Sequence, residues 1–127
     1  MFDHVEFSVS DIATTRRIYS AILIKLGIEE AFFDGGIGEL GYEKDNIVRL
    51  LITQGEATRP TLHLCFEARS STEVTRAYEA AINAGATDNG VPGYRENYGA
   101  GYFAAFVFDD DGHNIEMLYR DASAQSE

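Results

Sequence analysis

The sequence repeats itself, and this repeat limits the possible folds more than any other feature of the chain. A stretch that alternates between polar and apolar residues begins at His4, and a similar stretch contains His63. The spacing between these two histidines is the same as the spacing between Tyr19 and Tyr78. Self-similarity at a fixed period indicates one structural unit that occurs twice.

Each copy starts with a predicted strand that leads into a predicted helix. Residues 4–9 and 61–67 alternate with a period of two, the pattern of a strand with one buried face. The segments that follow carry apolar residues at helical spacing, after a serine, threonine or aspartate that can cap a helix. We expect helices over 12–26 and 73–84, each followed by a glycine that tolerates the left-handed conformation.

The rest of each copy is predicted to be strands and turns. Further strands are expected at 30–33, 38–43, 47–53, 102–108 and 114–119, and a loop is expected around Pro92-Gly93. The chain is therefore predicted to be one α+β domain over residues 1–127, built from two βαβββ modules in tandem. Module one spans 1–56, module two spans 60–121, and 122–127 is a frayed tail. The modules are expected to form one curved mixed sheet around a cup, with the helices on its convex face.

Composition excludes several classes of function. The net charge of −11, from 21 acidic and 10 basic residues, repels phosphate backbones, so nucleic acid is not an expected partner. No apolar stretch is long enough to span a membrane, and the N-terminus has no basic region ahead of an apolar one. The single cysteine, Cys65, excludes an internal disulfide and a zinc–thiolate site, which fits a reducing cytoplasm.

Polar side chains on the predicted strands indicate a metal site. If the apolar faces of the strands pack on the helices, His4, His63 and Glu116 all point to the opposite, concave side. Two imidazoles and one carboxylate form the facial triad that binds divalent iron, manganese, nickel, cobalt or zinc. The alternative is that each histidine is an ordinary polar residue of its strand.

A loop with tyrosines and an arginine precedes the strand at 102–108. Tyr94 and Arg95 are candidate substrate contacts, because loops beside a cup commonly bind ligands and arginine pairs with anionic groups as a fork. Tyr98 and Tyr102 are candidate catalytic residues, together with Glu116, because a tyrosine can donate a proton or a hydrogen bond. An ordinary surface loop is the competing interpretation.

Two other side chains are not expected to take part in chemistry. Cys65 is predicted to be packed rather than catalytic. His113 follows Asp111-Gly112 in a predicted tight turn and is expected to be solvated. The acidic run at 109–111 lacks the spacing of a calcium-binding loop.

The chain resembles the vicinal oxygen chelate superfamily, the glyoxalase/bleomycin-resistance/extradiol-dioxygenase group. The matching stretches are 4–11 with Tyr19 and Leu26-Gly27, His63 with Tyr78 and Gly85, and 105–116. The resemblance implies paired βαβββ modules, one divalent metal ion in the cup, and a small-molecule substrate chelated through adjacent oxygens. It places the metal ligands on the first and last strands of each module, here His4, His63 and Glu116, and it implies a homodimer.

One ligand position departs from the glyoxalase I pattern, because Val48 aligns with Glu116 in the repeat. The remaining set of two histidines and one carboxylate looks like that of extradiol dioxygenases and fosfomycin-resistance transferases. The resemblance thus implies a metal-dependent enzyme of the lyase, isomerase, transferase or dioxygenase type. The alternative is a protein of the bleomycin-resistance type, which sequesters a small molecule without metal.

Overall fold

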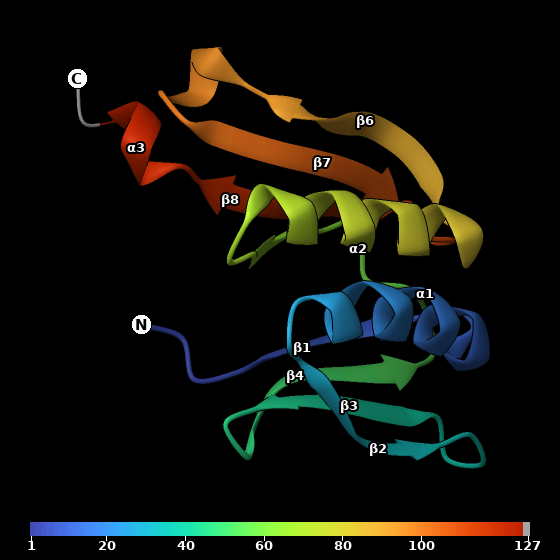
Figure 1. The fold of residues 1–127 in the computed structure, drawn as a ribbon. Helices are drawn as coiled ribbons and strands as arrows, with labels where there is room; N and C mark the ends of the chain where they lie inside the picture. Colours follow the sequence, from blue (N-terminus) through green and yellow to red (C-terminus); the bar gives the residue numbers. More distant parts are fainter. Residues whose placement is uncertain (126–127) are drawn as a thin grey trace.

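The computed structural model describes residues 1–125 as two modules of the same layout (Figure 1). The first module comprises β1 (Val5–Val9), α1 (Ile12–Lys25), β2 (Glu29–Asp34), β3 (Glu39–Lys44) and β4 (Ile47–Gln54). The second comprises β5 (His63–Glu67), α2 (Ser71–Asn83), β6 (Thr87–Tyr94), β7 (Tyr102–Phe108) and β8 (Asn114–Arg120), with a short 3-10 turn, η1 (Glu96–Tyr98), between β6 and β7. The predicted tail begins with one helical turn, α3 (Ala122–Gln125), and 126–127 lie outside the described residues.

The eight strands form two four-stranded mixed sheets with equivalent topology. The strand orders are β1-β4-β3-β2 and β5-β8-β7-β6. In each sheet the first strand runs parallel to the last strand of its module, and the other pairs are antiparallel. The α+β class and the tandem βαβββ modules are thus confirmed. The strands pair within each module, and the predicted single curved sheet is divided between two hydrogen-bonded sheets.

Local sequence accounts for the helix ends. The Asp11 side chain accepts hydrogen bonds from the backbone N–H groups of Ala13 and Thr14, and the Ser70 hydroxyl accepts one from the N–H of Glu73. Each helix is followed by a glycine with positive φ, Gly27 at 77° and Gly85 at 109°. These caps satisfy backbone groups that a helix end otherwise leaves without a partner, as the sequence predicts.

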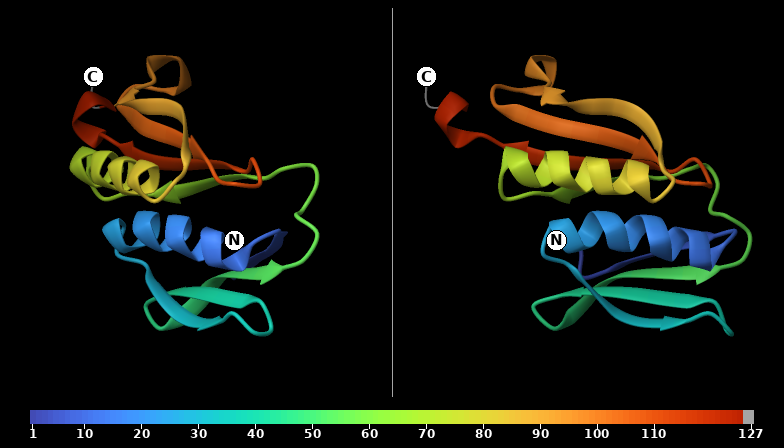
Figure 2. Two further views of the ribbon diagram at one scale, coloured as in Figure 1. Left: turned by 90° about the vertical axis from the view of Figure 1, so that its right-hand side faces the viewer. Right: turned by 45° about the vertical axis from the view of Figure 1, so that its right-hand side comes forward.

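Each helix packs on one face of its own sheet, and the two helices also pack against each other (Figures 1 and 2). The covered faces are apolar: Val9, Leu40 and Ile52 in the first sheet, and Val107, Ile115 and Met117 in the second, are fully buried. The alternate residues of these strands lie on the faces that the helices leave uncovered. The candidate site is built on the uncovered face of the second sheet.

Strand β6 was not predicted, and it replaces the first part of the expected loop. It carries Pro92 and two register shifts, between Asp88 and Gly90 and between Gly90 and Gly93. Proline and bulges are tolerated at the edge of a sheet, where one side of the strand forms no ladder hydrogen bonds. Because of these interruptions, the sequence of β6 does not show the regular alternation by which a strand is predicted.

The expectation that His113 is solvated is wrong, because its ring is fully buried between the modules. Its Nδ1 accepts a hydrogen bond from the Leu62 N–H at 2.9 Å, and its ring meets Phe7 edge-on at 5.3 Å. The preceding Asp109 is also buried, and its carboxylate accepts hydrogen bonds from the His113 N–H at 2.8 Å and from the Tyr19 hydroxyl at 2.7 Å. This turn therefore joins the second module to helix α1 of the first.

Replacing Tyr19 with phenylalanine is expected to lower the free energy of unfolding by about 1–3 kcal/mol, because the buried Asp109 carboxylate loses one donor. Burial and the adjacent Asp109 raise the pKa of Tyr19 far above its usual range, so its hydroxyl stays a donor at every pH of interest. Tyr78→Phe is the matched control, since Tyr78 holds the equivalent place in the repeat and donates to Asp88 at the surface. Its cost should be about 0.5 kcal/mol or less in the same urea titrations. Equal effects of the two variants would contradict this account.

None of the described helices, all within residues 1–125, is long and apolar enough to cross a membrane.

Candidate functional site

Three strands of the second sheet contribute side chains to its uncovered face. In the ladder, His63 of β5 lies opposite Asn114 of β8, and Cys65 lies opposite Glu116. On the other side of β8, Phe106 of β7 lies opposite Glu116. Because alternate residues of a strand share a face, these side chains stand together, on the side away from Ile115 and Met117.

Glu116 is the centre of this group. It is 3% exposed, and both of its carboxylate oxygens have a partner. Its Oε1 lies 2.9 Å from Nε2 of His63, whose side chain is 53% exposed, and its Oε2 accepts a hydrogen bond from the hydroxyl of Tyr102. The structure therefore brings together three residues that the sequence singled out, and it leaves the His63 ring open to a ligand.

Burial and the Glu116 carboxylate together raise the pKa of two neighbouring groups. Desolvation, together with the hydrogen bond to Glu116, raises the pKa of Tyr102 well above its usual range. Desolvation and the same carboxylate raise the pKa of the Cys65 thiol to about 12. Both groups therefore keep their protons at neutral pH, and Tyr102 acts as a hydrogen-bond donor to Glu116.

The expectation that Cys65 is packed is wrong. The residue is exposed and lies on the uncovered face beside Glu116. Its strand alternates as predicted, but no helix covers this side of it, so Cys65 shares the face of His63. Its raised pKa disfavours the thiolate, which is the form that acts as a nucleophile or binds a metal ion.

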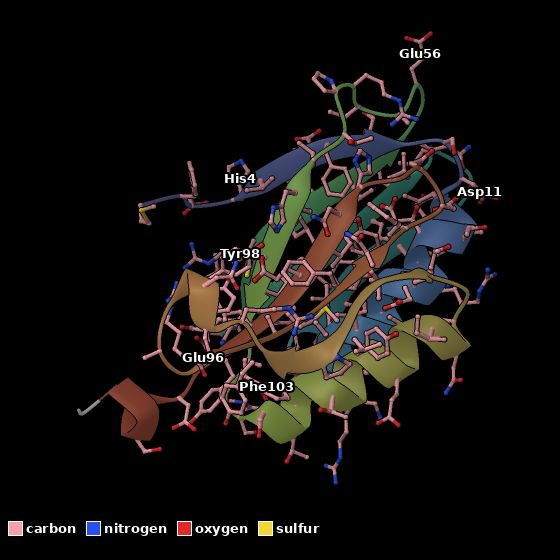
Figure 3. All side chains as sticks on the ribbon, turned by 90° about the horizontal axis from the view of Figure 1, so that it is seen from above. His4, Asp11, Glu56, Glu96, Tyr98 and Phe103 are labelled. Carbon is pink, nitrogen blue, oxygen red and sulfur yellow. The ribbon has the colours of Figure 1, made fainter. Side chains whose placement is uncertain are left out.

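His4 does not join the group within one chain. It lies immediately before β1, in the other sheet, where its Nδ1 is 2.8 Å from a carboxylate oxygen of Asp3 and its side chain is 52% exposed. Figure 3 shows it beside the first strand of the first module. Within residues 1–125 no three histidine, cysteine, aspartate or glutamate side chains are grouped so that they could hold a metal ion. One chain thus assembles two of the three predicted ligands.

The loop residues divide between the two faces of the second sheet. Arg95 and Tyr98 line a pocket of about 270 Å³ on the side of Glu116, and the Tyr98 ring meets the Tyr102 ring edge-on at 5.3 Å. Tyr94 packs on Phe103, on the opposite face, and donates a hydrogen bond to Asp121 at 3.3 Å. The structure therefore brings Arg95, Tyr98 and Tyr102 to the candidate site and does not bring Tyr94 to it.

Three further residues of the site were not singled out from the sequence. Asn89, Phe106 and Asn114 line the same pocket, and the Asn89 amide donates a hydrogen bond to the Asn114 carbonyl oxygen at 3.2 Å. Alternation with Ile115 and Val107 was enough to place Asn114 and Phe106 on this face. Asn89 gave no such signal, because it lies on the irregular strand β6.

Comparison with known families fits this architecture. The pattern of the Glyoxalase/Bleomycin resistance protein/Dioxygenase superfamily matches residues 1–117. The chain belongs to this superfamily. Members of the glyoxalase/bleomycin resistance/dioxygenase superfamily typically use a divalent metal ion, bind small molecules and often form dimers.

Solved structures of the superfamily share the fold over nearly the whole chain. A glyoxalase/bleomycin resistance protein from Albidiferax ferrireducens T118 is 28% identical with a TM-score of 0.78, over 94% of this chain and 99% of that one. The fosfomycin resistance protein FosX of Mesorhizobium loti is 21% identical, with a TM-score of 0.69, over 100% of this chain and 98% of that one. FosX of Listeria monocytogenes is 17% identical, with a TM-score of 0.71, over 98% of this chain and 97% of that one. No curated protein sequence matches the chain.

His63 and Glu116 have the chemistry of two of the ligands of a divalent metal ion. Imidazole and carboxylate ligands suit iron, manganese, nickel, cobalt and zinc. Two such ligands in adjacent positions, each about 2.1 Å from a metal ion, lie about 3 Å apart. The 2.9 Å between His63 Nε2 and Glu116 Oε1 agrees with that spacing.

Proposed function

We propose that the chain is a metal-dependent enzyme that acts on a small oxygenated molecule. His63 and Glu116 are two ligands of one divalent ion, and the third is His4 of a second copy of the chain. The observation that carries this proposal is the contact between a buried carboxylate and an exposed imidazole on an open sheet face. A buried carboxylate is retained at a cost in stability, which is consistent with a role as a ligand.

A homodimer supplies the missing histidine without any change in fold. The uncovered face of each sheet, and the β1 end that carries His4, are accessible to a second copy. In the two-fold dimer that we propose, module one of each copy meets module two of the other, so two identical sites form at once. The oligomeric state predicted from the sequence is thus a requirement of the proposed site.

The side chains around Glu116 have defined roles in this proposal. A divalent ion acts as a Lewis acid on a bound oxygen. Tyr102 orients the Glu116 carboxylate through its hydrogen bond, and its raised pKa keeps that donor in place. Tyr98, which contacts Tyr102, is close enough to the pocket to donate a hydrogen bond or a proton to a substrate.

Substrate contacts come from the β6–β7 region. Arg95 lines the pocket beside the candidate metal ligands and orients the substrate. Tyr94, at the end of β6, lies on the other face of the sheet and donates to Asp121, so it is not part of the proposed site within one chain. The identity of the ion separates the possible reactions, since iron indicates oxygen chemistry, and the other ions indicate lyase, isomerase or transferase chemistry.

Metal analysis of the protein, purified without chelator or affinity tag, tests the proposal. We expect about one divalent ion per chain, and no bound ion in His63→Ala. Glu67→Gln is the matched control, because Glu67 is exposed on the same strand and the variant should keep its metal. A protein that stays metal-free after incubation with iron, manganese, nickel, cobalt and zinc would contradict the proposal and favour metal-free sequestration of a ligand.

A further inference from the structure

Arg95 is unusual among the cations of the chain. The sequence has 10 lysine and arginine residues, all within the described part, and Arg95 is the one among them that is not exposed. Its Nη2 donates a hydrogen bond to the backbone carbonyl of Val91 at 2.7 Å. None of the ion pairs found within residues 1–125 includes Arg95, although the chain has an excess of 11 negative charges. A half-buried charge without a counter-ion is costly, and an external anion would remove that cost.

The backbone around Arg95 is shaped to hold its guanidinium. A Cβ added to Gly90 would lie 3.1 Å from Nη2 of Arg95 and 3.0 Å from the Phe106 ring, and one added to Gly93 would lie 3.2 Å from Nη1. The guanidinium carbon lies 5.5 Å from the centre of the Phe106 ring. Two glycines and an aromatic ring therefore fix the position of the charge without a carboxylate.

The pocket next to this guanidinium is rich in donors and has no acid in its lining. Asn89, Arg95, Tyr98 and Asn114 supply its polar groups. A guanidinium has five N–H donors, and that of Arg95 donates one hydrogen bond within the described residues, so most of its donors remain for an oxyanion. Such a lining suits a negatively charged group and disfavours a cation.

The pocket adjoins the candidate metal ligands. The Phe106 ring, on which Arg95 lies, is 6.2 Å from the His63 ring and is paired in the ladder with Glu116. Figure 3 shows Tyr98 on the turn that borders this region. A single small molecule can therefore contact Arg95 at one end and the His63–Glu116 pair at the other.

We propose that Arg95 binds an oxyanion, a carboxylate or a phosphoryl group, and that the substrate of this protein is a small anion held by that group. The placement of the reacting oxygens at His63 and Glu116 rests on the proposed function. The binding of an oxyanion at Arg95 does not, because it needs no metal. Arg95 is thus the residue that selects anionic over neutral substrates.

Anion titration of chelator-treated protein tests this inference separately from the metal proposal. Inorganic phosphate and benzoate are added at low ionic strength to ¹⁵N-labelled protein, with benzamide as the neutral counterpart of benzoate. We expect saturable shifts of the Gly90 and Gly93 amide signals with phosphate or benzoate, and none with benzamide. Binding of phosphate alone would indicate that the site takes a phosphoryl group, and binding of benzoate alone would indicate a carboxylate. Binding of both would indicate that the site recognises the oxyanion that the two groups share.

Variants identify the residue responsible. Arg95→Gln should weaken anion binding about tenfold or more, and Arg95→Lys should be intermediate because it keeps the charge and loses the fork. Arg76→Gln, on the exposed surface of α2, removes the same charge and should leave the affinity unchanged. Circular dichroism of Arg95→Gln and Arg95→Lys checks that each variant keeps the secondary structure of the wild type.

Absence of anion binding in the wild type, or equal weakening in Arg95→Gln and Arg76→Gln, would overturn the inference. A protein that binds manganese and no anion would keep the proposed function and lose this inference. Anion binding by a protein that takes up no metal would support this inference and contradict the proposed function.

Discussion

Replacing Glu116 with glutamine is expected to weaken divalent-metal binding by at least about 100-fold. The amide keeps the size of the side chain but carries no charge, and its NH₂ group would face either His63 or Tyr102, the two partners of the carboxylate. The loss should appear in calorimetric titrations with manganese as an affinity too weak to measure at protein concentrations that saturate the wild type. Circular dichroism separates this effect from unfolding.

The matched control is Glu67→Gln. Glu67 lies on β5 together with His63, is exposed, and is an acidic residue of the same uncovered face. Removing the charge of Glu67 changes the net charge by the same amount, so a general electrostatic effect would weaken metal binding equally in both variants. Unchanged affinity in Glu116→Gln would contradict its role as a ligand.

Alternation and capping signals were sufficient to locate most of the fold. They predicted β1, β5 and β8, the two helices and the glycines that follow them, because each of these features depends on residues close together in the sequence. They also placed His63 and Glu116 on one face, since both follow from the period of a strand. Strand β6 was missed because Gly90, Pro92 and Gly93 interrupt its pattern.

Contacts between the modules could not be predicted in this way. The sequence around His113 is typical of a solvated turn. The burial of this turn depends on a contact with a distant part of the chain, in which Tyr19 donates a hydrogen bond to Asp109. The relative position of the two sheets is also a long-range property. The two-residue alternation of side chains along a strand assigns His4 and His63 to uncovered faces. It does not show that these faces belong to separate sheets.

Mixed dimers of two defective chains should recover metal binding, and this prediction follows from a site shared between copies. His4→Ala removes the ligand of module one, and His63→Ala removes a ligand of module two. A dimer of one chain of each kind contains one site with all three ligands and one site that lacks both histidines. Each variant alone contains no complete site.

The most direct test of the shared site is therefore the metal content of purified mixed dimers. The two variants are co-expressed with different tags, and only dimers that carry both tags are collected, so that subunit exchange is controlled. We predict one divalent ion per mixed dimer, two per wild-type dimer, and none in a dimer of either variant alone. Mixed dimers without metal, beside a wild type that binds it, would contradict a site formed by His63 and Glu116 of one chain and His4 of another.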